Sequence, residues 1–259
     1  MSAQPSSAEQ GMTLVEHLTE LRKRLIISVL AVGIGMVIAF LAYPWIIDFL
    51  IHPYKELVQA RPGSSISEGR LLQTDPLEGF GVRMKTAAYA GIGLAMPVIL
   101  WQVWKFVTPG LYPNERRYAV PFVLSALALF IMGAVLAYYT LPRALEFLID
   151  IAGGDFVTAF AAAKYFQLVV YMMLAFGVGF EFPIVLIFLQ LAGVITPDML
   201  KRSRRFAIVG ICVLVAVITP SGDPISMLML SVPMCIFYEA SIHIGRLLTR
   251  RRDARAAAA

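Results

Sequence analysis

The chain has 259 residues, of which 59% are hydrophobic and only 15% are charged. Soluble domains carry about 25% charged and roughly 45–50% apolar residues, so this composition excludes a water-soluble globular domain. The formal net charge of +5 does not indicate nucleic-acid binding, because the lysines and arginines form short clusters at the ends of apolar blocks, where membrane topology explains them.

Six apolar blocks, most of them near the roughly 20 residues that cross a bilayer, alternate with polar breaks. We therefore predict an all-α, polytopic membrane protein in which residues 1–250 form a single six-helix domain. Residues 251–259 are expected to form a disordered cytoplasmic tail. The fifth and sixth spans are expected to be short, the fifth because a Pro- and Gly-containing turn closes it. In chain order, the predicted spans are residues 26–50, 86–107, 118–141, 166–191, 206–218 and 227–247.

The distribution of basic residues predicts the orientation of the spans. Fifteen of the 22 lysines and arginines lie before the first span, in alternate connections and after the last span, whereas seven lie in the other connections among acidic residues. Because cytoplasmic loops retain positive charge, we predict that both termini are cytoplasmic. The exterior loops, residues 52–78 and 142–164, are the longer ones, and we expect them to form a small cap.

Two acidic residues precede the first span. Glu16 and Glu20 are four residues apart and therefore lie on one face of the helical turn that this segment predicts. One interpretation is an exposed pair between Glu20 and Arg24, which contributes about 0.3–0.5 kcal/mol. The other is that these carboxylates bind a ligand.

A third acid, Glu115, lies in the second cytoplasmic connection, a Pro- and Gly-containing loop that is otherwise basic. A carboxylate among cations keeps its charge, and a guanidinium binds a carboxylate through two parallel hydrogen bonds. The cytoplasmic acids therefore suit a ligand that presents arginines.

Four motifs then establish a resemblance to a known family, TatC of the twin-arginine protein translocase. The segment HLTELRKR at residues 17–24 resembles the family's HLxELRxR signature, and PVILWQVW at residues 97–104 resembles its second span. FGVGFEFP at residues 176–183 resembles its fourth span, and Thr219-Pro220 with Asp223 resembles the turn between its fifth and sixth spans. The motifs recur in order over about residues 13–247.

The resemblance implies a concave, glove-like bundle in the bacterial cytoplasmic (inner) membrane, and a core subunit of an oligomeric translocase. It implies binding of twin-arginine signal peptides of folded proteins at the cytoplasmic face. It also implies TatA- and TatB-type single-span partners and export driven by the proton-motive force. Glu20 and Glu115 are implied to be the carboxylates nearest the paired arginines. Around them, the residues that match motif positions are Arg22, Phe106, Pro109, Leu111 and Tyr112.

Glu181 lies inside the fourth predicted span, where an ionisable side chain is costly enough to suggest function. One interpretation is a protonated acid bonded to a neighbouring polar group. The resemblance implies a position on the concave surface, where Glu181 meets a polar residue of a partner helix. The nearby polar candidates are Gln167, Tyr171 and Gln190.

Further polar and turn residues have both a structural and a functional interpretation. Glu239 and His243, at i and i+4, predict a buried structural hydrogen bond. Asp223 beside Pro and Gly predicts a turn, while the resemblance implies that Thr219 and Asp223 contact a partner. Pro53 matches a family proline and is otherwise a loop residue.

The main alternative is a proton-coupled small-solute transporter, which predicts inverted repeats and broken helices that this sequence does not show. An enzyme is not expected, because no HExxH or GxSxG motif occurs. We expect no catalytic residue, metal or cofactor. The two cysteines, Cys212 and Cys235, lie in apolar blocks as small hydrophobic residues.

Overall fold

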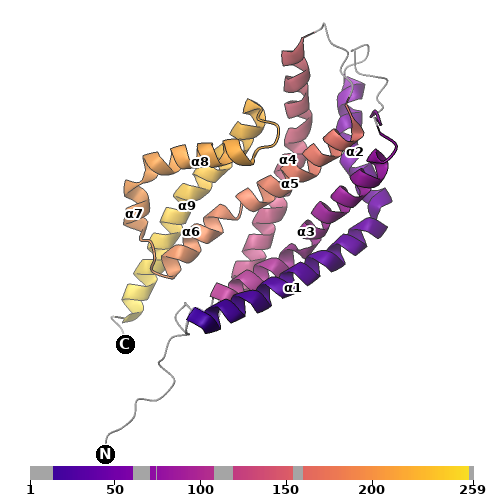
Figure 1. Ribbon diagram of the computed structural model, residues 1–259. Coiled ribbons are helices and arrows are strands. Elements are labelled where there is room, and N and C mark those ends of the chain that lie inside the picture. The colour runs from indigo at the N-terminus through magenta and orange to yellow at the C-terminus, as the bar shows by residue number, and fades with distance from the viewer. Residues whose placement is uncertain (1–13, 61–70, 74, 108–118, 154–159, 257–259) are drawn as a thin grey trace, which may run out of the picture.

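The computed structural model describes residues 14–60, 71–73, 75–107, 119–153 and 160–256, and over these ranges the chain is a bundle of helices (Figure 1). One isolated β-bridge in the described part pairs Leu72 with Ala161. The helices are α1 Leu14–Leu41, α2 Tyr43–Ala60, α3 Glu78–Val107, α4 Ala119–Ala152, α5 Ala162–Gly179, α6 Phe182–Leu191, α7 Pro197–Arg202, α8 Arg204–Ile218 and α9 Pro224–Ala256.

Five helical stretches of the described chain are long and apolar enough to cross a membrane, as expected of a multi-pass membrane protein. The segment predicted as the fifth span corresponds to α8, which has only 15 residues. It is therefore about 22 Å long, against roughly 30 Å of hydrocarbon, so the helix at the predicted fifth span is short, as expected. The five long stretches are Val15–Leu41, Glu78–Phe106, Val120–Ile151, Ala162–Leu191 and Pro224–Leu247.

The last helix is longer than predicted. The apolar part of α9 alone is 24 residues long, so the sixth span is not short. The helix then continues to Ala256, and the tail predicted to be disordered is helical over residues 251–256. Alanine and arginine are among the strongest helix formers, which explains the extension.

The first predicted span, residues 26–50, is divided between two helices. Pro44 has no N–H, and its ring opposes the carbonyl of Phe40, so α1 ends at Leu41 and α2 begins at Tyr43. Arg83 of α3 donates to the freed Phe40 carbonyl at 3.1 Å, and its guanidinium lies 4.2 Å from the Phe40 ring centroid. Burial raises the pKa of the Tyr43 phenol, and the charge of Arg83 opposes this effect.

A second proline divides the fourth predicted span. Pro183 lies at the start of α6, where it cannot donate the hydrogen bond that would continue α5. The backbone N–H of Glu181 instead bonds the carbonyl of Val178 at 3.0 Å, in a tighter turn. Glu181 is consequently placed at the break between the two helices.

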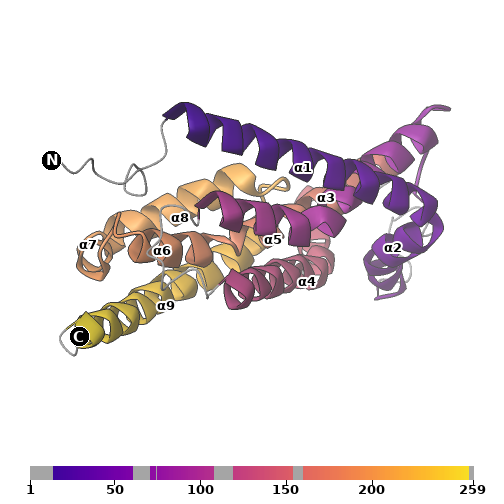
Figure 2. The ribbon, with the colours of Figure 1, turned by 90° about the horizontal axis from the view of Figure 1, so that it is seen from below.

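The long helix α1 packs mainly along α3, as both views show (Figures 1 and 2). The two backbones approach closely at Gly35 and Gly91. A Cβ atom on Gly91 would lie 2.5 Å from the backbone nitrogen of Met36, which is closer than real Cβ contacts allow. Only glycine permits this crossing, in the manner of small residues at membrane helix interfaces.

Both ends of the described chain lie at the same end of the bundle (Figures 1 and 2). The first turn of α1, the last turn of α3 and the last turns of α9 share that end. A small aromatic cluster there includes Trp104 and Phe122, whose ring centroids are 4.5 Å apart. The larger core, around Tyr54, Phe176 and Met234, joins α2, α4, α5 and α9.

The described parts of the two connections predicted to be exterior are in contact. The backbone N–H of Leu72 donates to the carbonyl of Phe160 at 2.9 Å, and that of Ala162 donates to the carbonyl of Leu72 at 2.8 Å. Glu78, the first residue of α3, accepts a 2.7 Å hydrogen bond from the backbone N–H of Ala163. A carboxylate at a helix start is favoured by the helix dipole, so Glu78 fixes the beginning of α5.

Candidate functional site

The first turns of α1 pack against the last turns of α3. The rings of His17 and Phe106 are stacked, with centroids 4.5 Å apart and planes 26° apart. This contact places Glu20 one turn further along α1, beside the end of α3. The connection that contains Glu115, residues 108–118, follows in the sequence and lies outside the described residues.

Glu20 forms the predicted ion pair with Arg24, and a third residue joins it. Arg24 donates one hydrogen bond to Glu20 Oε1 at 2.7 Å and another to Gln102 Oε1 of α3 at 3.3 Å. The side chains of Arg24 and Glu20 are only 22% and 15% exposed. The pair is therefore largely covered, unlike the exposed contact that spacing alone predicts.

The second oxygen of Glu20 lacks a donor. Oε2 is buried and accepts no hydrogen bond in the described structure, and the Nε atom of Arg24 likewise finds no acceptor. A buried polar atom without a partner destabilises the fold by about 1–3 kcal/mol. The site thus holds one guanidinium on one carboxylate oxygen, while the other oxygen accepts no hydrogen bond within the described structure.

The other residues predicted around Glu20 have different positions. Arg22 is exposed and, at i+2, does not share the face of Glu20, while Phe106 stacks on His17. Gln102 and His17 are the functional candidates that sequence reasoning missed. The sequence could have indicated Gln102, because a polar residue near the end of an apolar span is unusual. Pro109, Leu111, Tyr112 and Glu115 lie outside the described residues.

Glu181 lies at the α5–α6 break and is partly buried. Its Oε1 is buried without a hydrogen-bond partner among the described residues. Of its predicted neighbours, Gln190 instead donates to the carbonyls of Leu186 and Ser241, which links α6 to α9. Tyr171 packs edge-on against the ring of Tyr89, with centroids 6.4 Å apart.

Asp223 has a structural role at the start of α9. Its Oδ1 accepts a 2.7 Å hydrogen bond from the backbone N–H of Ser226, and its other oxygen bonds the hydroxyl of Ser221. This geometry is an N-cap followed by Pro224, and Asp223 is only 2% exposed. Thr219 is also buried and donates to the carbonyl of Val215 at 2.6 Å. The predicted turn role of Asp223 is therefore observed.

The predicted pairing of Glu239 with His243 is wrong. Glu239 instead accepts a 2.7 Å hydrogen bond from Arg204, the first residue of α8, and His243 is exposed. The i, i+4 spacing allowed the helical pair, but the arginine of a neighbouring helix supplies a stronger, charged donor.

Pro53 lies inside α2 and is buried, so its prediction as a loop residue is also wrong. A proline here removes the N–H that would bond the carbonyl of Phe49. The hydroxyl of Tyr138 donates to that carbonyl at 3.0 Å and compensates for the lost bond.

Within the described ranges, no group of three His, Cys, Asp or Glu side chains is arranged to hold a metal ion. Both cysteines are free thiols. The candidate site in the described chain therefore centres on Glu20, Arg24 and Gln102.

The chain was then compared with known proteins. The family model described as Sec-independent protein translocase protein (TatC) matches residues 16–233. The Sec-independent protein translocase protein TatC of Deinococcus radiodurans is 38% identical over 90% of this chain and 86% of its own length. That of Aquifex aeolicus is 38% identical over 93% of this chain and 98% of its own length. A crystal structure of the twin-arginine translocase receptor TatC matches with a TM-score of 0.74 at 37% identity, covering 90% of this chain and 100% of that chain.

Proposed function

Because this chain belongs to the TatC family of Sec-independent protein translocases, we propose that it is the receptor for twin-arginine signal peptides at the cytoplasmic face of a bacterial inner membrane. Family membership favours this function over a proton-coupled small-solute transporter. The protein acts by binding and by assembly, without making or breaking covalent bonds.

The observation that carries the proposal is the state of Glu20. One of its oxygens already accepts a hydrogen bond from the guanidinium of Arg24, and the other is buried without a donor. An incoming arginine supplies the missing donor with its planar fork, whereas a lysine offers a compact ammonium without that geometry. Arg24 retains a second acceptor, Gln102, while the peptide binds.

Glu115 is the second proposed carboxylate for the paired arginines. It is assigned by its match to the family motif, as are Pro109, Leu111 and Tyr112. The stacking of His17 on Phe106 supports this assignment, because it holds the end of α3 beside Glu20. Arg22 and Phe106 complete the proposed surface.

The assembly of the receptor with other subunits is also a proposal. TatA- and TatB-type single-span proteins would join it in an oligomeric complex, and the proton-motive force would drive export. Glu181 is the proposed intramembrane contact, since Oε1 has no partner at a break between two helices. Glu181→Ala is expected to abolish co-purification of the TatB-type subunit and to leave signal-peptide binding intact. Unchanged co-purification would refute this contact.

The test of the receptor function is peptide binding by the purified full-length chain. Glu20→Ala and Glu115→Ala each remove a charged hydrogen-bond acceptor, and such bonds contribute about 1.5–3 kcal/mol. Each variant is therefore expected to bind a twin-arginine peptide about ten- to a hundredfold more weakly. Glu16→Ala, an exposed carboxylate one turn earlier, is the matched control and should bind normally. Normal binding by the Glu20 and Glu115 double variant would refute the proposed site.

A further inference from the structure

The guanidinium of Arg24 lies between two acceptors on different helices. Its Nη2 donates to Glu20 Oε1 of α1 at 2.7 Å, and its Nη1 donates to Gln102 Oε1 of α3 at 3.3 Å. The i, i+4 order, with the acid N-terminal to the arginine, favours the first contact within the helix itself. The second contact depends on how α1 crosses α3, and Gln102 is only 8% exposed there. Arg24 therefore has a close partner on its own helix and a more distant one on α3.

The pair between Arg24 and Glu20 is incomplete. A guanidinium and a carboxylate can form two parallel hydrogen bonds, but here a single bond joins Nη2 to Oε1. The Nε atom of Arg24 and Oε2 of Glu20 are both buried and have no hydrogen-bond partner among the described residues. A second guanidinium that binds Glu20 through both oxygens would make the stronger contact, so the existing pair is one that such a ligand can replace.

While this pair persists, Glu20 is closed to other donors. Oε1 is occupied by Arg24, and Oε2 is covered from solvent. The two opposite charges also cancel at short range, which reduces the attraction of an arriving cation. Arg24 is the group free to move, because its side chain is partly exposed and Gln102 already provides a second acceptor. Binding of another guanidinium to Glu20 therefore requires Arg24 to leave Oε1.

We propose that Arg24 occupies Glu20 in place of the signal-peptide arginine until the peptide binds, and that Gln102 then receives Arg24. This inference rests on the proposed receptor function and adds an order of events at the same site. In the free protein, Arg24 neutralises a largely covered carboxylate. The peptide replaces it with a guanidinium that forms two bonds, and Arg24 shifts onto Gln102. A lysine forms no such fork and gains less from the exchange.

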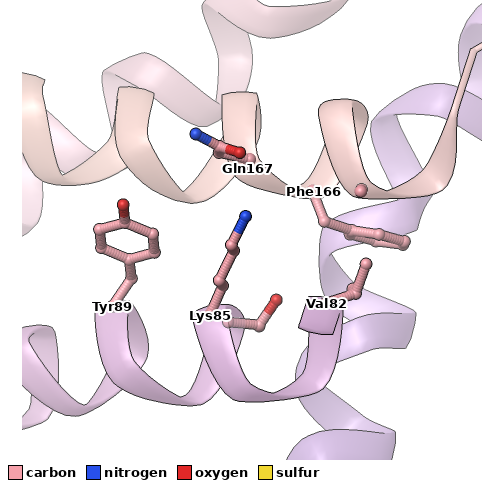
Figure 3. A pocket seen from close by; sticks show the side chains of 7 residues that line it. Val82, Lys85, Tyr89, Phe166 and Gln167 are labelled. Atoms are coloured by element: carbon pink, nitrogen blue, oxygen red, sulfur yellow. The ribbon is translucent and has the colours of Figure 1, made fainter. Parts of the chain in front are cut away.

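The test is the dissociation constant of an Arg-Arg signal peptide for the purified full-length protein in detergent. Arg24→Met should bind the peptide about fivefold more tightly, because the free protein then lacks a pair that the complex does not contain. Lys23→Met, at an exposed lysine next to Arg24, removes the same charge and is the matched control. Lys85→Met is the remote control, since Lys85 extends from α3 toward α5 in a separate pocket (Figure 3), about 25 Å along α3 from Gln102. Neither control should tighten binding.

Gln102→Leu tests the transfer of Arg24 separately. The displaced guanidinium would lack its acceptor, so the variant should bind the peptide about fivefold more weakly, the effect of one hydrogen bond. In the Arg24→Met background the same substitution should have no effect, because no guanidinium then needs the acceptor. A purely structural role of Gln102 would instead weaken binding equally in both backgrounds.

Four results would overturn the proposal. They are unchanged or weaker binding by Arg24→Met, equal tightening in Lys23→Met, wild-type affinity in Gln102→Leu, and equal effects of Gln102→Leu with and without Arg24. The Gln102→Leu result decides the question even if Arg24→Met does not fold. The receptor function fails on a different result, equal binding of Arg-Arg and Lys-Lys peptides by the wild-type protein. The two failures are therefore distinguishable in one set of measurements.

Discussion

Glu20 shows how far a single residue can be interpreted from sequence. The spacing predicted its pair with Arg24, and the pair is present at 2.7 Å. Its low exposure and its third member, Gln102, were not predictable, because they depend on how α1 crosses α3. Glu239 illustrates the same limit, since its arginine partner comes from another helix.

The coupling of Glu20 to Arg24 is measurable in a double-mutant cycle. Glu20→Ala and Arg24→Met each remove the pair and leave a partly buried partner, so each should destabilise the protein by about 1–2 kcal/mol. The double variant should be less destabilised than the sum, by about 1 kcal/mol. Thermal unfolding in detergent measures these differences, with exposed Lys23→Met as the control. Strict additivity would mean that the two side chains do not interact.

Two substitutions of Asp223 separate its role as a helix N-cap from any effect of its negative charge. Asp223→Ala removes the acceptor of the Ser226 N–H and should lower the free energy of unfolding by about 1 kcal/mol, whereas Asp223→Asn should retain most of the stability. Thermal unfolding of the three proteins compares them. If Asn destabilised as much as Ala, the negative charge of Asp223 would be needed for a role other than capping.

At the scale of elements, prolines explain the differences between prediction and structure. Apolar periodicity found the blocks correctly, but it does not register the backbone hydrogen bonds that Pro44 and Pro183 remove. The carbonyl freed by Pro44 is bonded by Arg83, and the one freed by Pro53 is bonded by Tyr138. Such compensation comes from helices distant in sequence, so it became visible only in the fold.

The close crossing of α1 and α3 predicts that a methyl group added at Gly91 destabilises the protein. Gly91→Ala would place a Cβ atom 2.5 Å from the Met36 backbone nitrogen, so the helices must separate. Overpacking of this kind destabilises by about 1–3 kcal/mol. Gly93→Ala, on the same helix with nothing within 4 Å, is the control and should retain wild-type stability. Equal melting temperatures for the two variants would contradict the observed crossing.

At the scale of the whole molecule, composition and charge predicted an all-helical, multi-pass membrane protein, as the helices and the solved relative show. The breaks within the first and fourth spans and the length of α9 were not predicted. The site is only partly described, because Glu115 and its neighbours lie outside the described ranges.

The orientation remains a prediction with a direct test. Both described ends of the chain lie at one end of the bundle, and most basic residues share that side of the predicted topology. Single cysteines introduced near each terminus of a variant with both native cysteines replaced should react with a membrane-impermeant thiol reagent only in inverted vesicles. Labelling of either terminus in intact cells would reverse the assignment.

The central claim is that the cytoplasmic face selects paired arginines. The most direct measurement is cross-linking of the purified, detergent-solubilised chain to a signal peptide carrying Arg-Arg, in parallel with the same peptide carrying Lys-Lys. We predict selective capture of the Arg-Arg peptide, lost when Glu20 and Glu115 are both replaced by alanine. Equal capture of the two peptides would contradict the account.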